Sequence, residues 1–287
     1  MSVQSRSTCA YVYRPATAAD VPAAHALSVH LKWPHREEDW AMVQRTSEGF
    51  VALADGKLIG VAFTCHQGDW SSIGLVIVSD EHQGRGVGRR LMELCLAATA
   101  PRTPLLNATT AGAPLYKSQG FVEFAHIQQH QGVPDMPAAP SPAEGSTIRT
   151  LTPADYPQLI GLANAGSGLD RTAVLTDLLP DAEQVIGLEV HGQLQGFALL
   201  RRFGRGHLIG PVVAHETAQA RSMITELLRL IPGMFVRFDL LADCGLVPWL
   251  ESLGLPCVDR APRMVLGSPP PVDAAVRQFA LVTQAIG

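Results

Sequence analysis

Three glycines, Gly84, Gly86 and Gly88, restrict the fold of this chain more than any other feature of its sequence. They follow an apolar run at residues 73–78, whose length and β-branched side chains predict a buried strand. They precede residues 89–96, in which apolar and polar side chains alternate with a helical period. The sequence therefore predicts a strand, a glycine-rich turn and a helix in immediate succession.

This turn is predicted to bind an anion. Glycine adopts positive φ easily and lets a bulky anion approach the backbone without interference from Cβ atoms. The free amides of the first helical turn point toward such an anion, with the positive end of the helix dipole behind them. Arg85, Arg89 and Arg90 add full positive charge. The chemistry fits a phosphate or a pyrophosphate, although the glycines alone are also compatible with a purely structural turn.

The spacing of the turn excludes two common phosphate-binding motifs. The run Gln83-Gly84-Arg85-Gly86-Val87-Gly88 lacks the Gly-Lys-Ser/Thr ending of a P-loop and the Gly-x-Gly-x-x-Gly order of a dinucleotide site. A second predicted strand at residues 105–107 follows, and then the run Leu115-Tyr116-Lys117-Ser118-Gln119-Gly120-Phe121. This order of parts resembles that of the GNAT N-acetyltransferase superfamily.

The resemblance implies an acetyl-CoA site in the first half of the chain. In that family the strand before the turn splays away from the next strand, pantetheine lies in the gap, and the pyrophosphate binds to the turn. Asn107 ends the second strand, before a loop at residues 107–114 that is longer than is usual in the family. The cofactor-binding residues that the resemblance implies are Val76, Ile77, Val78, Gln83, Gly84, Arg85, Gly86, Val87, Gly88, Arg89 and Asn107.

Tyr116 is the catalytic residue that the resemblance implies. Acetyl transfer to an amine leaves a thiolate that needs a proton, and Tyr116 would supply it as a general acid. A phenol has a pKa near 10 and a thiol a pKa of about 8.5, so this proton transfer requires local help. The alternative is that Tyr116 only packs against pantetheine.

The acceptor amine is expected near residues 31–40, a polar and aromatic stretch between two helical patterns that lines the acceptor pocket in the family. Trp33 and Glu38, together with Asp69 in the loop after a predicted hairpin, are the candidate substrate contacts. Alternatively, Trp33 and Trp40 pack the helices onto the sheet while the charges face solvent. The carboxylates considered as the general base are Glu37, Glu38, Asp39 and Asp69.

The second half of the chain repeats the first, which predicts an internal duplication. Four segments of the second half resemble segments of the first. Residues 148–155 resemble residues 13–20, and residues 185–197 resemble the Asp55-Gly56 hairpin. Residues 208–214 resemble residues 72–78, and residues 249–255 resemble residues 115–121. We expect a catalytic GNAT domain at residues 1–130, a Pro/Ala-rich linker at 131–147 and a degenerate GNAT-like domain at 148–287. The expected fold class is α+β: each domain has a mostly antiparallel sheet, with a splayed central strand pair, flanked by helices.

The second domain is expected to lack acetyl transfer activity. Aligning residue 209 with residue 73 sets Gln219–Ile224 against the glycine turn, where Met223 and Ile224 would crowd a pyrophosphate. Leu250 stands in the position of Tyr116, so the hydroxyl is missing. This half resembles GNAT-like domains that follow an ordinary GNAT domain in bacterial proteins, and it is expected to pack against the first domain. A short helix is predicted at residues 272–286.

Composition excludes several classes of partner. At 287 residues with 47 % hydrophobic side chains, the chain can build two globular units that each bury a core. The net charge of −4 provides no large basic field for nucleic acid or an anionic membrane surface. No export signal opens the chain, and no apolar run reaches about 18 residues, so no membrane span is expected.

The cysteines and histidines indicate neither disulfides nor a metal. The five cysteines include no Cys-x-x-Cys pair, and they are predicted to be reduced residues of a cytoplasmic protein. His126 and His130 lie in a strand-like segment, where a spacing of four is too long for one metal ion. The oligomeric state is expected to be a monomer or a homodimer.

The sequence thus predicts an acetyl-CoA-dependent N-acetyltransferase that acts in its first domain on a primary amine of a small molecule, with acetyl-CoA as cosubstrate. Two alternatives stay open: an acyl-CoA-binding sensor or scaffold without turnover, and a protein N-acetyltransferase. Among small acceptors, an amino acid, an antibiotic and a polyamine are all considered. The scarcity of acidic clusters argues against a polyamine, because several positive charges need carboxylate partners.

Overall fold

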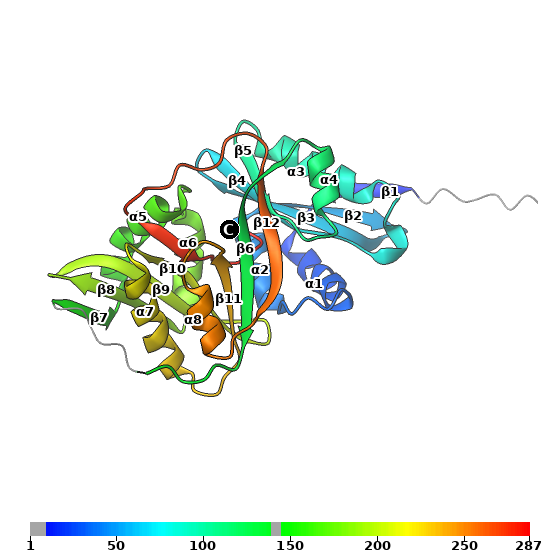
Figure 1. Ribbon diagram of the computed structural model, residues 1–287. Helices are drawn as coiled ribbons and strands as arrows, with labels where there is room; N and C mark the ends of the chain where they lie inside the picture. The colour runs from blue at the N-terminus through cyan, green and yellow to red at the C-terminus, as the bar shows by residue number, and fades with distance from the viewer. Residues whose placement is uncertain (1–9, 139–144) are drawn as a thin grey trace, which may run out of the picture.

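The computed structural model describes residues 10–138 and 145–287, and it places 13 strands in one continuous sheet (Figure 1). The strands are β1 Tyr11–Pro15, β2 Glu48–Ala54, β3 Lys57–Gln67, β4 Trp70–Val78, β5 Thr103–Asn107, β6 Val122–Gly132, β7 Ser146–Thr150, β8 Gln184–Val190, β9 Gln193–Phe203, β10 Gly206–Ala214, β11 Val236–Leu241, β12 Cys257–Val265 and β13 Arg277–Ala280. The α-helices are α1 Val21–His30, α2 Glu37–Thr46, α3 Val87–Thr99, α4 Ala113–Ser118, α5 Tyr156–Ser167, α6 Thr172–Leu178, α7 Thr217–Leu230 and α8 Val247–Ser252.

The order of the strands shows the duplication. From one edge the sheet runs β1-β2-β3-β4-β5, and from the other edge it runs β7-β8-β9-β10, with β13 and β11 next. Most neighbouring strands are antiparallel, but β4 pairs with β5 in parallel and β10 pairs with β11 in parallel. Each half therefore has the expected mixed sheet with one central parallel pair, and the predicted fold class is confirmed.

Two strands are exchanged between the halves. β6 belongs to the first half of the chain, yet it lies between β12 and β11 of the second half. β12 in turn lies between β5 and β6. Strand pairing therefore crosses the linker predicted at residues 131–147, and each half completes the sheet of the other. The linker boundaries remain a prediction, and residues 139–144 at its centre lie outside the described residues.

The three largest of five hydrophobic clusters in the described residues hold the layers together. One face of the first half packs under α3 and α4, with Leu91 and Phe121 in that cluster. The corresponding face of the second half packs under α7 and α8, around Met223 and Leu250. The helices on the opposite face, α1, α2, α5 and α6, contribute to a single cluster that contains residues of both halves, among them Trp40. The two halves therefore have a shared core in addition to their own cores.

The duplication extends to individual hydrogen bonds. Arg14 and Asp20 form an ion pair at 2.7 Å, and the same distance separates Arg149 and Asp155. In each half the aspartate also accepts a hydrogen bond from the backbone amide of a threonine three residues earlier. The amide of Phe121 donates to the carbonyl of Tyr116 at 3.1 Å, and Leu255 donates to Leu250 at 3.1 Å.

Two expectations for the second half are wrong. The helix predicted at residues 272–286 is absent, since Arg277–Ala280 forms β13 and no helix follows it in the described chain. The alignment of Gln219–Ile224 with the glycine turn also fails, because the connection from β10 to α7 consists only of His215 and Glu216. Met223 and Ile224 lie inside α7, fully buried in the second core. The second half therefore lacks the glycine turn altogether, and Met223 and Ile224 do not occupy its place.

Candidate functional site

The first half contains the splayed strand pair that the sequence predicted. β4 and β5 pair only over Trp70–Ile73, which lies opposite Thr103–Leu106. Leu75 has φ +50°, and the pairing of β3 with β4 shifts register beside it, so β4 carries a bulge. Residues 74–78 pair with β3 alone among the described strands. Their backbone groups on the other side face a gap.

The glycine turn lies at the end of this gap. Gly84 has φ +71° and Gly86 has φ +82°, a left-handed backbone that favours glycine. A Cβ atom at either position would meet nothing within 4 Å, so the backbone angles require glycine there and the surrounding space stays open. Gln83 donates from Nε2 to the carbonyl of Val78 at 3.1 Å and to Asp80 at 2.9 Å. Its side chain therefore fixes the turn to the end of β4.

Positive charge surrounds the turn at the N-terminus of α3. Arg85 is exposed and forms no ion pair among the described residues, and Arg89 contacts only the hydroxyl of Ser118, at 3.3 Å. Arg90 differs, because Glu93 holds it at 3.0 Å. Two unneutralised guanidinium groups and the first-turn amides of a 13-residue helix therefore face the solvent at the turn.

Tyr116 lies on α4, in the core beneath α3. Its side chain is 7 % exposed, and its ring meets that of Phe121 edge to face at 6.2 Å. Burial raises the pKa of Tyr116 to about 12, so its hydroxyl stays protonated at neutral pH. The second half holds Leu250 at the equivalent helical position, fully buried.

The corresponding gap in the second half is filled by the chain itself. β13 lies between β10 and β11, with Ala280 opposite both Val212 and Leu240. The gap between β10 and β11 is therefore occupied by backbone, and the phosphate-binding turn that would accompany it is deleted.

A cavity of about 150 Å³ lies where the first half meets the second, and we call it the interdomain cavity. Among its lining residues, the first half provides Trp33, His35, Leu75, Asn107 and Gln129, and the second half provides Arg237, Asp259, Gln284 and Ala285. Leu75 is the bulge residue of β4. The cavity is therefore adjacent to the point at which β4 and β5 separate.

Two buried polar atoms of residues that line this cavity have no hydrogen-bond partner in the described chain. They are Oδ1 of Asn107 and Nδ1 of His35. Burial, and next the charge of Arg237, lower the pKa of His35 to about 4, so its imidazole is neutral at physiological pH. Buried polar atoms usually have partners, so these two atoms are free to bind a water molecule or a polar group of a ligand.

The charges near this cavity are largely paired. Arg237 donates to both carboxylate oxygens of Asp239, at 2.9 and 3.0 Å. Gln284 donates to the same carboxylate at 3.1 Å. The guanidinium is therefore neutralised where it borders the cavity, and Asp259 lies at the exposed side.

The structure separates the predicted substrate contacts. Trp33 lines the interdomain cavity, whereas Trp40 is fully buried and donates from Nε1 to Ser28 at 3.1 Å. Glu38 lines a different cavity, and Asp69 lies before β4, at the end of that strand opposite the glycine turn.

His35 stood in the predicted stretch, but its sequence neighbours gave no signal to single it out. The residues from β11, β12 and the C-terminal segment could not be found without the strand exchange.

Other groups in the described chain carry no further site. No helix there is long and apolar enough to cross a membrane. Cys65, Cys95 and Cys244 are buried and free, Cys257 is half-buried and free, and Cys9 lies outside the described residues.

Comparison with known proteins agrees with this architecture. Two family models, each described as an acetyltransferase (GNAT) domain, match residues 27–139 and residues 159–280. The uncharacterized N-acetyltransferase YitH of Bacillus subtilis (strain 168) is 30 % identical over 224 residues, which cover 77 % of this chain and 78 % of YitH.

Solved structures share the fold. A Pyrococcus horikoshii protein superposes with a TM-score of 0.80 at 19 % identity, covering 100 % of this chain and 99 % of its own. A tandem GNAT protein from the clavulanic acid biosynthesis pathway superposes with a TM-score of 0.64 at 17 % identity, covering 90 % and 99 %. The chain therefore belongs to the GNAT acetyltransferase family, as an acyltransferase with two GNAT domains in tandem.

Proposed function

We propose that this chain transfers an acetyl group from acetyl-CoA to a small primary amine, and that the reaction takes place in the first half alone. One observation carries the proposal: beyond Ile73 no described strand lies between β4 and β5, and this gap ends at the glycine turn, whereas β13 fills the gap between β10 and β11. A cofactor that extends along a splayed strand has room in the first half only.

The residues around the open gap fit acetyl-CoA by position. The turn at residues 83–88, with Arg85 and Arg89, would hold the phosphates. The backbone groups of Val76, Ile77 and Val78 that face away from β3, apart from the Val78 carbonyl that Gln83 contacts, would hold pantetheine and polarise the thioester carbonyl. A preorganised donor of this kind contributes typically about 3 kcal/mol. Tyr116 would donate a proton to the departing thiolate. Burial keeps its hydroxyl protonated but also makes it a weaker acid than the thiol, so the transfer has to be coupled to departure of the thiolate.

The interdomain cavity would receive the amine. Oδ1 of Asn107 is an unpartnered acceptor, and Nδ1 of the neutral His35 is a second one in the tautomer that carries its proton on Nε2. An amine has the N–H donors that both atoms lack. The sequence predicted that Asn107 binds the cofactor, and we propose that it contacts the acceptor amine instead. Neutral acceptors also leave the nitrogen lone pair free to attack, because neither group forms an ion pair that would favour the ammonium form.

The size of the interdomain cavity favours a small acceptor. Its volume is about 150 Å³, and drug-sized ligands usually occupy about 300 Å³ or more. Trp33, Leu75 and Ala285 supply apolar walls around the polar atoms. A compact primary amine with a short apolar body fits this composition better than a polyamine or the N-terminus of a folded protein.

Calorimetric titration with acetyl-CoA tests the location of the site. We expect one acetyl-CoA per chain, followed by release of free thiol when a library of small amines is added. Two sites per chain would contradict the role assigned to β13. Binding without thiol release from any amine or N-terminal peptide would favour a sensor or scaffold, and release with peptides alone would favour a protein N-acetyltransferase.

A further inference from the structure

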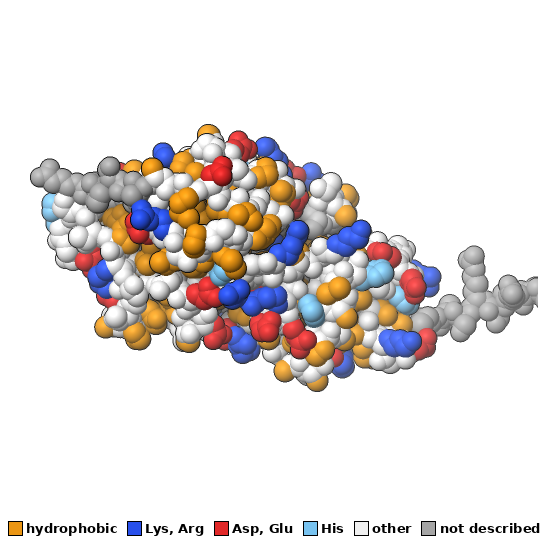
Figure 2. Space-filling model, turned by 90° about the horizontal axis from the view of Figure 1, so that it is seen from below, with side chains coloured by type: hydrophobic (Ala, Val, Ile, Leu, Met, Phe, Trp, Pro, Cys, Tyr) orange, Lys and Arg blue, Asp and Glu red, His pale blue; other side chains and the backbone are white. Residues whose placement is uncertain are grey.

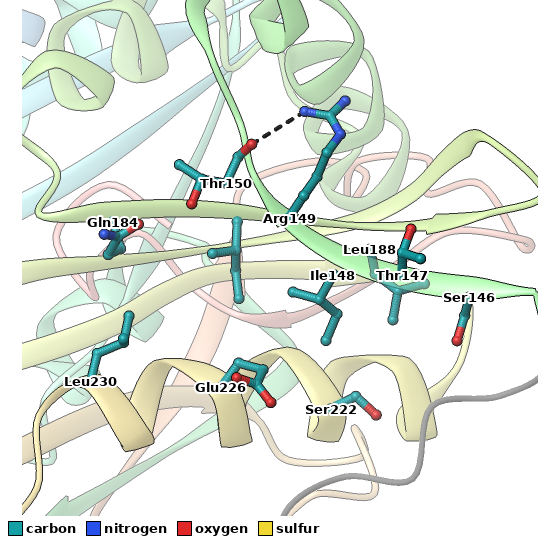
Figure 3. Close-up of a pocket in the computed structure, with 11 residues that line it drawn as sticks. Ser146, Thr147, Ile148, Arg149, Thr150, Gln184, Leu188, Ser222, Glu226 and Leu230 are labelled. Atoms are coloured by element: carbon teal, nitrogen blue, oxygen red, sulfur yellow. Dashed lines mark hydrogen bonds between the residues drawn. The ribbon is translucent and has the colours of Figure 1, made fainter.

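A second cavity lies in the second half, away from the gap between β4 and β5. It has a volume of about 540 Å³ and separates β7 and β8 from α7 (Figure 3). We call it the β7–α7 cavity. Figure 3 shows Ser222, Glu226 and Leu230 on the side of α7 that faces the strands, and Ile148 pointing from β7 toward them. Its volume is within the range of about 300–1,000 Å³ that is usual for small-molecule sites.

The first half shows what normally fills this space. The ion pairs of Arg14 and Arg149 are equivalent, so Tyr13 corresponds to Ile148 and Tyr11 corresponds to Ser146. Tyr11 and Tyr13 pack against the core beneath α3. The second half has lost two aromatic rings at matched positions, and the loss leaves the cavity.

The helix above the cavity has changed as well. A Cβ on Gly60 would lie 3.1 Å from Leu91, and a Cβ on Gly196 would lie 3.0 Å from Met223. These matched contacts align Leu91 with Met223, and therefore Leu94 with Glu226. Leu94 packs against the core of the first half. The apolar Leu94 of the first half is thus replaced by the carboxylate of Glu226 in the second half, which also lacks the two aromatic rings.

The carboxylate of Glu226 has no counter-charge. Neither an ion pair nor a hydrogen bond links it to another described side chain, although it is half-buried. Arg149 lines the same cavity, but it is bound to Asp155 and Glu189, each at 2.7 Å, and in Figure 3 it points away from α7. The cavity therefore combines one unneutralised negative charge with apolar walls from Ile148, Ile186 and Leu188.

We infer that the β7–α7 cavity binds a primary ammonium ion with an aromatic body of one or two rings. The ammonium group pairs with Glu226, and the rings occupy the space that Tyr11 and Tyr13 fill in the first half. This site is separate from the interdomain cavity and does not depend on acetyl transfer. The second half, which has lost its cofactor gap, thereby gains a ligand site of its own.

Titration of the full chain with 2-phenylethylamine, without acetyl-CoA, tests this site. We expect Glu226→Gln to weaken binding about tenfold or more, since a hydrogen bond to a charged group contributes about 1.5–3 kcal/mol. Ile148→Tyr should abolish the same binding, because it restores the ring of the first half. Glu251→Gln on exposed α8 is the matched control and should leave binding unchanged. 2-Phenylethanol, which lacks the charge, should bind at least about tenfold more weakly.

Three results would overturn the inference. The first is no binding of 2-phenylethylamine to the unmodified chain at millimolar concentration. The second is binding that neither Glu226→Gln nor Ile148→Tyr reduces, which would place the amine elsewhere. The third is equal affinity for 2-phenylethylamine and 2-phenylethanol, which would mean that apolar contacts alone account for the binding. Thermal melts confirm that each variant is folded, and Glu226→Gln keeps the test valid if Ile148→Tyr unfolds.

Discussion

Asn107 donates a hydrogen bond from Nδ2 to the carbonyl of Gln284 at 2.7 Å, across a sequence separation of 177 residues. The contact fixes the C-terminal segment against the end of β5. It also brings Ala285 onto β4, where a Cβ on Gly74 would overlap the carbonyl oxygen of Ala285. The last residues of the second half therefore form a wall beside the strands that we assign to catalysis.

Figure 2 shows the molecule from below, with a broad hydrophobic area between charged groups.

Gln284→Ala should raise the KM for the acceptor amine about tenfold and leave the affinity for acetyl-CoA unchanged. Gln284 donates to Asp239 at 3.1 Å and to Gln129 at 3.4 Å, so its loss leaves a buried carboxylate with fewer partners beside the interdomain cavity. Steady-state kinetics and calorimetry measure the two quantities. Gln193→Ala, at an exposed position, is the control. A parallel loss of acetyl-CoA affinity would show that the segment supports the cofactor instead.

Gly86→Glu should abolish acetyl-CoA binding while the chain stays folded. The substitution places a negative charge at the turn and a side chain at φ +82°, which costs about 1–3 kcal/mol. Gly192→Glu is the matched control, because that turn residue has φ +75° and equally open surroundings. Both variants carry the same strain and charge, so a loss of acetyl-CoA binding in Gly86→Glu alone would identify the glycine turn as the phosphate-binding site. Unchanged acetyl-CoA affinity in Gly86→Glu would contradict that assignment.

Tyr116→Phe should lower kcat about a hundredfold, the usual scale of general acid catalysis, and change the affinity for acetyl-CoA little. The ring and its contact with Phe121 are kept, so the fold should be unaffected. Tyr13→Phe, beneath the same helix but outside the gap, controls for loss of a hydroxyl. A kcat equal to that of the unmodified chain would mean that Tyr116 only packs.

Asp20→Asn should make the stability of the chain less sensitive to acid. The hydrogen bonds from Arg14, and next those from Thr17, lower the pKa of Asp20 from 3.8 to about 2. Because the folded-state pKa lies below the unfolded one, the carboxylate stabilises the fold above about pH 4, and this contribution is lost as the pH falls toward about 2. At neutral pH the variant should lose on the order of 1 kcal/mol.

Urea unfolding between about pH 3 and 7 measures this difference. Asp155→Asn tests the equivalent ion pair, where Arg149 lowers the pKa of Asp155 for the same reason. The two variants should show the same direction of change. A difference between Asp20→Asn and the unmodified chain that does not shrink as the pH falls would contradict the assignment.

Local patterns predicted what local forces determine. The strand, glycine turn and α3 follow from spacing and backbone angles within about 25 residues, and the structure places them as expected. Equivalent positions such as Tyr116 and Leu250 could be matched by sequence because short helices with the same hydrogen bonds hold both. The proposed roles of these residues remain predictions.

Long-range pairing could not be predicted. Residues 272–286 have a helical composition, but pairing with β10 and β11 outweighs that intrinsic preference and produces β13. The interdomain cavity depends on strands that lie more than 100 residues apart in the chain, such as β5 and β12. Its residues from the second half, including Arg237 and Gln284, therefore had no local signal.

The exchange of β6 and β12 also governs the order in which the chain can fold. β6 has β12 and β11 as its neighbours, and β12 ends at Val265, near the end of the chain. During synthesis the ribosome releases the first half long before these partners exist. Since domains usually fold as units from the N-terminus, the first half cannot complete this sheet until β11 and β12, more than 100 residues after β6, have been synthesised. β5 and β6 lack the strands that pair with them in the folded chain for that time, and exposed strand edges promote aggregation.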